Sequence, residues 1–212
     1  MSDLMDSNEQ KLKIGVLALQ GAFIEHVQVL RELGAEVREV RLPEDMQDLD
    51  GLIIPGGEST AIGKLMVNWG LLEPVKEMAH NHKPVWGTCA GMILLAKDIG
   101  GFDQPLLGLM DIKVKRNAFG SQLDSFETDL DIPALGQKPF PAIFIRAPFI
   151  QEIGSGVQDL AHLKPDEIVA ARQGNLLATA FHPELSGDPR FHQMFLDMVK
   201  AARHVREVIA TS

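Results

Sequence analysis

The sequence predicts an α/β fold: a single domain with a doubly wound, mostly parallel sheet flanked by helices, and with added antiparallel strands in its second half. Two short apolar runs, residues 13–19 and 50–55, lack the alternation of a half-exposed strand, which is typical of strands buried on both faces. Each run is followed by a glycine turn and a helical segment, and such strand–helix repeats form parallel sheets with right-handed crossovers. After residue 100, strand-like runs alternate with Gly, Pro, Asn and Asp turns.

The first half of the chain should supply the parallel core. Residues 36–40 carry charges, so we place this strand nearer to the sheet edge. Phe23, Val27, Leu30 and Leu33 lie near one face of a helix that Gly34 can end. The expected strands are residues 13–19, 36–40, 50–55 and 85–87, and the expected helices are residues 23–33, 61–69, 71–81 and 92–97.

The second half should add the antiparallel strands and a closing amphipathic helix at residues 188–209. The turn at residues 173–175 suits a hairpin. We found no internal repeat and no linker, so we predict one domain over residues 13–203. Residues 1–12 are then a disordered leader or a remnant of protein expression, and residues 204–212 a C-terminal tail. The expected strands are residues 109–115, 126–130, 142–146, 168–171 and 176–180.

Composition excludes several classes of function. The formal net charge of −9, from 20 basic and 29 acidic side chains, argues against a nucleic acid or an anionic membrane as the main partner. One cysteine excludes an intrachain disulfide and fits a reducing compartment. No apolar run approaches the roughly 18 residues that a membrane span needs, and residues 1–10 do not resemble a secretory signal. We therefore expect a cytoplasmic location.

The first chemical motif is Gly87-Thr88-Cys89-Ala90-Gly91, between the strand at residues 85–87 and a helix. It has the form of a nucleophile elbow, G-x-S-x-G, with cysteine in place of serine. A lone cysteine is more often a small buried hydrophobic residue. At this junction, however, its sulfur would be exposed above the sheet edge and would lie at the first turn of a helix, which favours the thiolate.

A cysteine nucleophile needs a base, and the base needs an orienting acceptor. His182 follows an apolar strand and has a carboxylate, Glu184, two residues on, across the stiff Pro183. We therefore expect His182 as the base and Glu184 as its orienting group. The other six histidines lie within or beside helix-like or polar segments, so they are interpreted as surface or satisfied core residues without a role in the site.

The turn Gly56-Gly57-Glu58-Ser59 allows two interpretations. It could be only a tight strand-to-helix turn with a serine cap. Alternatively, its backbone N–H groups complete an oxyanion hole with the N–H of Ala90. The turn lacks the spacing of a phosphate-binding P-loop. The chain also shows no dinucleotide-binding glycine fingerprint and no His/Cys spacing for zinc, so no cofactor and no metal are expected.

These motifs together resemble the class I, triad-type glutamine amidotransferases, which have a flavodoxin-like fold. Within that class the chain is most similar to the glutaminase subunits of pyridoxal 5′-phosphate synthase, from Lys13 to about Lys200. The Gly-Gly-Glu-Ser-Thr and Ile-Arg-Ala-Pro pieces are the most specific. The matching segments are residues 17–21 with Glu25 and His26, and residues 55–60, 116–120, 124–127 and 144–148.

The resemblance implies a mechanism. The Cys89 thiolate attacks the side-chain amide of L-glutamine. His182 protonates the leaving ammonia and then activates the water that hydrolyses the γ-glutamyl thioester, while Glu184 orients His182. The N–H groups of Gly57 and Ala90 stabilise the oxyanion, and Gln20, at the mouth of the site, is expected to help gate it. By the same resemblance, the bound glutamine is surrounded by Gly57, Glu58, Ser59, Arg116, Ile145 and Arg146. Either arginine could instead be a solvated surface residue, although a guanidinium suits a substrate carboxylate.

The resemblance also implies a partner. The released ammonia would pass to a separate synthase subunit within a large hetero-oligomer, where it is used for pyridoxal 5′-phosphate (vitamin B6) synthesis. Two alternatives stay open at this point. The same triad could serve a different ammonia acceptor or hydrolyse other amide bonds. The chain could also be a silent subunit that only regulates a synthase, although the intact Cys89, His182 and Glu184 argue against this.

Overall fold

Strands and helices alternate through the first half of the chain, as predicted. The computed structural model describes residues 10–116 and 125–211. The helices are α1 (Phe23–Glu32), α2 (Ser59–Asn68), α3 (Leu72–His80), α4 (Ala90–Leu95) and α5 (Arg190–Ala210). The strands are β1 (Lys13–Leu17), β2 (Glu36–Val40), β3 (Gly51–Ile54), β4 (Val85–Thr88), β5 (Ala96–Asp98), β6 (Met110–Lys115), β7 (Ser125–Leu130), β8 (Phe140–Ile145), β9 (Phe149–Ile153), β10 (Gln158–Lys164), β11 (Glu167–Gln173) and β12 (Leu176–Thr179).

The main sheet has the strand order β2-β1-β3-β4-β12-β11-β9-β6-β5, with β10 paired to β11 outside this path. Strands β2, β1, β3, β4 and β12 are mutually parallel, whereas β11 pairs antiparallel with β12 and with β9. The predicted parallel sheet with added antiparallel strands is therefore confirmed, and β2 lies at the sheet edge as expected. The turn at residues 173–175 joins the antiparallel pair β11–β12, as predicted.

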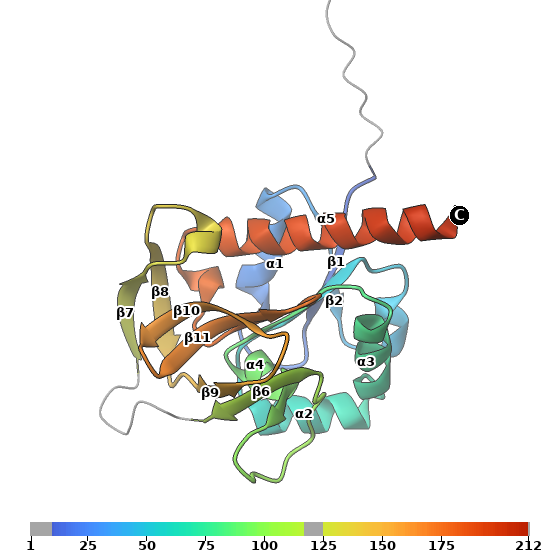
Figure 1. The fold of residues 1–212 in the computed structure, drawn as a ribbon. Coiled ribbons are helices and arrows are strands. Elements are labelled where there is room, and N and C mark those ends of the chain that lie inside the picture. Colours follow the sequence, from blue (N-terminus) through green and yellow to red (C-terminus); the bar gives the residue numbers. More distant parts are fainter. Residues whose placement is uncertain (1–9, 117–124, 212) are drawn as a thin grey trace, which may run out of the picture.

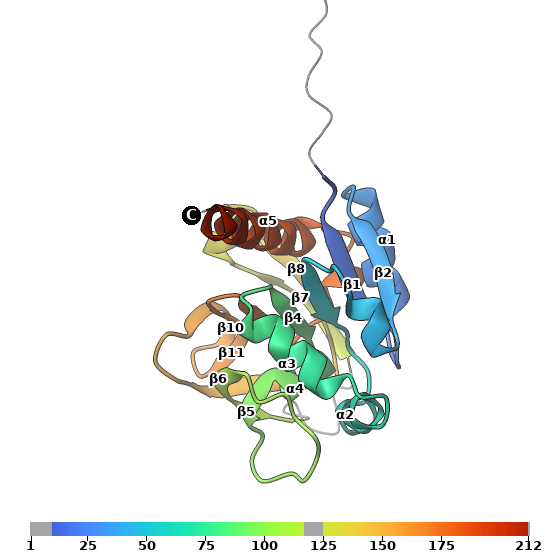
Figure 2. The ribbon, with the colours of Figure 1, turned by 90° about the vertical axis from the view of Figure 1, so that its right-hand side faces the viewer.

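Helices cover both faces of this sheet. In Figure 1, α5 crosses above the strands, α3 lies to their right, and α2 lies below α3. Figure 2, turned by 90°, shows α1 beside β2 and β1. The face under α5 is filled by aromatic rings, with Trp86 of β4 packed against Phe191 and Phe195 of α5. All three side chains are fully buried, and burying rings of this size supplies much of the stability of such a core.

The structure adds strands that the sequence did not predict. They are β5, β9 and β10. Within the part of the chain that the structure describes, β7 and β8 form a separate two-stranded antiparallel sheet. The predicted boundary at residue 203 falls inside α5, which continues to Ala210. Before β1, Gln10 accepts hydrogen bonds from the Arg203 guanidinium of α5, at its backbone carbonyl (3.0 Å) and its side chain (2.6 Å). Residues 1–9 and 117–124, and with them most of the predicted segment 116–120, lie outside the described residues.

None of the helices within residues 10–116 and 125–211 combines the length and the apolar character that crossing a bilayer requires. Over the same residues, no group of three or more His, Cys, Asp or Glu side chains is arranged to hold a metal ion.

Candidate active site

Cys89 lies at a strained turn between β4 and α4. Its φ of 49° is in the left-handed region that non-glycine residues rarely adopt. The packing after the turn is tight, as Gly91 shows: a Cβ added there would lie 2.0 Å from the carbonyl oxygen of Ile54. The glycine of the motif is therefore required for close packing of α4 on β3. This is the elbow geometry that the spacing predicts. Because α4 has only six residues, as the predicted helix had, its dipole is a small aid to the thiolate.

His182 reaches the same place because β12 pairs in parallel with β4. Thr179 lies opposite Thr88, and the backbone N–H of Cys89 donates to the Thr179 carbonyl at 2.8 Å. Both strands therefore end at the same sheet edge, where ligands of open α/β sheets bind. His182 also needs a glycine beside it, since a Cβ on Gly56 would lie 2.4 Å from its Cε1 atom. The structure therefore brings His182, the predicted base, to the pocket that Cys89 also lines.

Glu184 completes a buried hydrogen-bonded series. His182 Nδ1 and Glu184 Oε1 are 2.7 Å apart, and both side chains are almost fully buried. Burial lowers the pKa of His182, but hydrogen bonds to Cys89 and Glu184, together with their negative charges, outweigh it and raise the pKa to about 10. The imidazole therefore holds its proton at neutral pH, as it must if it is to stabilise a cysteine thiolate and later protonate a leaving amine.

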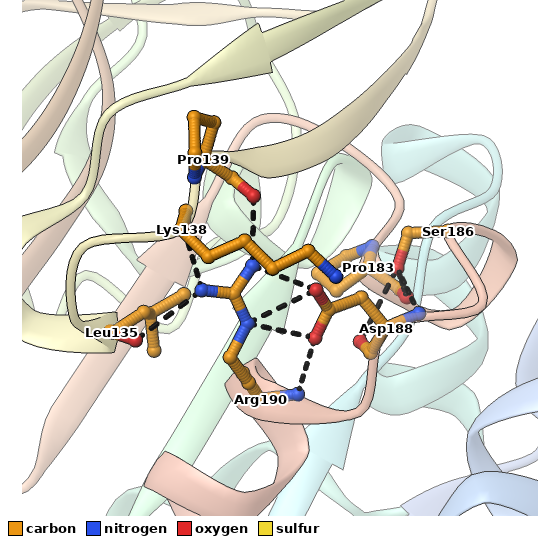
Figure 3. A network of polar contacts seen from close by, with 7 residues as sticks. All are labelled: Leu135, Lys138, Pro139, Pro183, Ser186, Asp188 and Arg190. Atoms are coloured by element: carbon orange, nitrogen blue, oxygen red, sulfur yellow. Dashed lines mark hydrogen bonds and ion pairs between the residues drawn. The ribbon is translucent and has the colours of Figure 1, made fainter.

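The segment that carries Glu184 is fixed by a polar network, drawn in Figure 3. Arg190, at the start of α5, makes a two-oxygen contact with Asp188 and donates to the carbonyls of Leu135, Lys138 and Pro139. The hydroxyl of Ser186 donates to the Pro183 carbonyl at 2.7 Å. This network ties the 3₁₀ turn Pro183–Leu185 to the start of α5 and to the loop before β8, so the position of the carboxylate does not depend on one turn alone.

A pocket of about 360 Å³ opens in front of Cys89 and His182. Among the described residues that line it are all those predicted for the site, apart from Glu184, which lies behind His182. The lining includes Gln20, Gly57, Glu58, Ser59, Ala90, Arg116, Ile145 and Arg146. The thiol of Cys89 is 3.9 Å from the carbonyl oxygen of Ile145. The structure thus brings together side chains from separate segments of the chain around one nucleophile.

Glu58 has a structural task that the sequence assigned to serine. Its carboxylate accepts hydrogen bonds from the backbone N–H groups of Thr60 (3.0 Å) and Ala61 (2.7 Å) and so caps α2. Partial burial raises the pKa of this carboxyl, but the two backbone hydrogen bonds and the nearby Arg116 guanidinium outweigh it, and the net pKa is lowered. Glu58 is therefore ionised at the pocket rim.

Sequence reasoning missed Gln104. Its side-chain carbonyl accepts hydrogen bonds from the hydroxyls of Ser59 and Thr60 (both 3.1 Å) and from the guanidinium of Arg116 (3.0 Å). Phe102 also lies against Arg116, with the guanidinium 5.0 Å from the ring centroid. Because Gln104 is in an irregular loop between β5 and β6, no sequence periodicity marks it.

Sequence reasoning also missed the position of two histidines beside the site. His26 and His192 are fully buried and lie directly behind Glu184, with His26 Nε2 3.3 Å from Glu184 Oε2. Helical spacing contained a signal for both. His26 is four residues before Leu30 on the inner face of α1, and His192 precedes Phe195 by three residues on the inner face of α5.

Comparison with known proteins identifies the family of the chain. A model of the SNO glutamine amidotransferase family matches residues 16–201. The chain belongs to this family. Its relatives include the "Pyridoxal 5'-phosphate synthase subunit PdxT" of Herpetosiphon aurantiacus, which is 60% identical over 190 residues, covering 88% of this chain and 100% of the relative. The protein of the same name from Moorella thermoacetica is 61% identical over 188 residues, covering 89% and 100%.

Solved structures confirm the fold of this glutamine amidotransferase. One, described as a glutamine amidotransferase, has a TM-score of 0.83 and 48% sequence identity, and covers 88% of this chain and 98% of that one. A putative GMP synthase component from Thermoplasma acidophilum has a TM-score of 0.71 at 18% identity, covering 94% and 100%. At that identity the likeness concerns the fold alone.

Proposed function

We propose that this chain is the glutaminase subunit of a pyridoxal 5′-phosphate synthase, and that it hydrolyses L-glutamine to L-glutamate and ammonia. The observation that carries this proposal is the buried series Cys89–His182–Glu184 at the wall of a pocket, in a chain of this amidotransferase family. Its relatives at about 60% identity bear the name of a synthase subunit. We propose one glutaminase domain, which α5 extends beyond the predicted boundary to Ala210, and a location in the cytoplasm, consistent with the single cysteine.

The proposed reaction begins with attack of the Cys89 thiolate on the side-chain amide carbon of glutamine. The negative charge that develops on the amide oxygen is stabilised by the N–H groups of Gly57 and Ala90. His182 gives its proton to the departing ammonia, and a γ-glutamyl thioester remains on Cys89. His182 then takes a proton from water, which attacks the thioester and releases glutamate. Glu184 holds the imidazole in the tautomer and orientation that both steps need.

Recognition of glutamine is proposed for the opposite side of the pocket. Arg116 and Arg146 offer guanidinium groups to the α-carboxylate, and the ionised Glu58 suits the α-ammonium group. Ser59 and Ile145 complete the lining. Gln20, whose side chain accepts a hydrogen bond from the Glu58 backbone, is placed to control the shape of the oxyanion turn.

Ammonia would then pass to a separate synthase subunit in a large hetero-oligomer. The test is glutamate release from L-glutamine by the purified chain, with and without that subunit. We expect the synthase subunit to stimulate release and Cys89→Ala to abolish it, while the Cys89→Ala complex should still make pyridoxal 5′-phosphate from ammonium salt. Absence of hydrolysis in both conditions would refute the glutaminase and favour a silent regulatory subunit.

A further inference from the structure

Two buried histidines stand behind the proposed triad, and the reaction written above does not use them. His26 comes from α1 and His192 from α5, and neither side chain is exposed to solvent. His26 Nδ1 and His192 Nε2 are 2.8 Å apart, although the residues are 166 positions apart in the sequence. Trp86 packs edge-on against both rings. A buried pair of this kind needs a defined arrangement of protons, because every unpaired N–H or lone pair costs free energy.

The pair contacts the side of Glu184 that faces away from His182. Glu184 Oε1 bonds His182 Nδ1 at 2.7 Å, whereas Oε2 lies 3.3 Å from His26 Nε2. Among the described residues Oε2 makes no hydrogen bond, and the His26 nitrogen, at ion-pair distance, is the polar group placed to compensate it. The Thr88 hydroxyl is 3.4 Å from the same His26 nitrogen. The second oxygen of this buried carboxylate therefore depends on the His26 ring.

The distances select one set of tautomers. His26 Nε2 must carry a proton, since two lone pairs would otherwise face each other across 3.3 Å. His26 Nδ1 is then an acceptor, so His192 Nε2 must be its donor at 2.8 Å. The remaining nitrogen, His192 Nδ1, is buried without a partner among the described residues. A lone pair left unpaired there costs less free energy than an unpaired N–H group would. The proton on His26 thus fixes the position of the proton on His192.

Burial keeps both rings neutral. It lowers the pKa of His26 well below its usual value, and positive charge on His192 or His182 would lower it further. It also lowers the pKa of His192, to about 4. The titratable groups around the pair are Glu184 on one side and, beyond it, His182 and Cys89. The two neutral rings therefore lie next to the Glu184 carboxylate, with the protonated His182 on its far side.

We propose that His26 and His192 are positioning residues for Glu184. His192 Nε2–H fixes the tautomer of His26, and His26 Nε2–H holds Glu184 Oε2, so that Oε1 stays aligned with His182. The inference rests on the proposed triad, and its effect is on the protonated His182 and the Cys89 thiolate that it stabilises. Without His26, the buried Oε2 would lose this polar neighbour and Glu184 would turn away from its aligned position, so the imidazolium–thiolate pair would weaken.

The test uses the fact that Cys89 is the only cysteine of the chain. Its rate of alkylation by iodoacetamide, measured against pH, reports the thiolate without requiring turnover of glutamine. In His26→Leu we expect the pH of half-maximal rate to rise by about one unit and the rate at neutral pH to fall about tenfold. His26→Gln should stay near the parent values, because its amide N–H can replace Nε2–H. The exposed His80→Leu serves as the surface control.

The second histidine has its own matched pair. His192→Leu should shift the alkylation profile in the same direction, because His26 can then adopt the other tautomer. His192→Gln, which keeps an N–H donor toward His26, should restore it. Thermal unfolding of each variant shows whether it is folded. A folded His26→Leu with the parent profile would overturn the proposal, as would equal shifts in the Leu and Gln variants, which would mean that only packing matters.

The proposal can also be tested on the unaltered chain, without any variant. Nitrogen-15 spectra of the histidine rings should show His26 and His192 neutral from pH 6 to pH 8, each with its proton on Nε2. A proton on His26 Nδ1, or a charged His26 in this range, would overturn the proposal. If the parent chain failed to hydrolyse glutamine, the proposed function would fall, but alkylation and ring spectra would still decide whether the histidines position Glu184.

Discussion

The side-chain carbonyl of Gln20 accepts a hydrogen bond from the backbone N–H of Glu58 at 2.8 Å. This bond joins the turn after β1 to the turn after β3, whose Gly57 is proposed to supply one oxyanion donor. The contact is close, since a Cβ on Gly57 would lie 2.5 Å from Gln20 Oε1. The first turn thus restrains the backbone of the second.

Replacing Gln20 should therefore affect turnover more than binding. In Gln20→Met the acceptor is lost, and we expect kcat to fall about tenfold with little change in KM, because one oxyanion donor is less well placed. Gln20→Glu keeps an acceptor oxygen and should retain more activity. Steady-state kinetics of glutamate release measure both. A Met variant with unchanged kcat would show that the turn holds its shape without this bond.

Adding one methyl group at Gly56 should displace the proposed base. The new Cβ would meet His182 Cε1 at 2.4 Å, so Gly56→Ala forces the ring or the turn to move. We expect kcat to fall by at least about a hundredfold, within the range that general acid–base catalysis contributes. Gly34→Ala is the control, because nothing lies within 4 Å of its added Cβ. It should lower stability, through its φ of +87°, and leave kcat unchanged.

Gln104 should control substrate affinity. Gln104→Leu releases the Ser59 and Thr60 hydroxyls and the Arg116 guanidinium from their shared acceptor, so the pocket wall loses its fixed shape. We expect KM for glutamine to rise about tenfold and kcat to change less, because an element of binding rather than of the chemistry is lost. Gln104→Glu keeps the acceptor oxygen and should show the smaller increase. An unchanged KM in the Leu variant would contradict this role.

Arg190 should contribute mainly to stability. Its guanidinium bonds Asp188 and three backbone carbonyls, a geometry that an ammonium group cannot reproduce. We expect Arg190→Lys to lower the free energy of unfolding by about 2 kcal/mol, because carbonyls are left without donors. Urea unfolding monitored by tryptophan fluorescence measures this. Asp188→Asn offers a double-mutant cycle, in which additive losses would show that the two side chains do not act as a unit.

The buried histidines should make the protein sensitive to acid. The unfolded chain protonates His192 near pH 6.5, whereas the folded chain does so only near its lowered pKa of about 4. Stability is therefore present above pH 6.5 and is lost as the pH falls toward 4. His192→Gln should reduce the loss of unfolding free energy between pH 7 and pH 5 by about 2 kcal/mol. The raised pKa of His182 acts in the opposite direction, but it contributes to both proteins and cancels in the comparison.

The sequence was sufficient to predict those elements whose structure is decided by a local pattern of residues. The apolar run of β1, the elbow at Cys89 and the His-Pro-Glu segment each contain their own signal, and the structure brings the last two together. Strands β9 and β10 were missed because they have no such pattern. In β10 burial does not alternate, and its pairing with β11 contains register shifts, so its residues show neither a regular apolar face nor a continuous apolar run.

The supporting residues of the site were missed for a different reason. Gln104 meets Ser59 across 45 residues of sequence, and His192 meets His26 across 166. Such contacts arise from the packing of whole elements, which no local spacing encodes. Burial of His26 and His192 could have been predicted from helical periodicity, but their partner could not.

The parallel pairing of β4 with β12 also has a consequence for synthesis of the chain. The strand that leads to the nucleophile is complete by Thr88, but the strand beside it is the last one made, and Trp86 donates to Thr179 from 93 positions away. On the ribosome β4 therefore waits with an unpaired edge until nearly the whole domain has emerged. A chain cut short before β12 would have a cysteine without its base, so nascent fragments cannot turn over substrate.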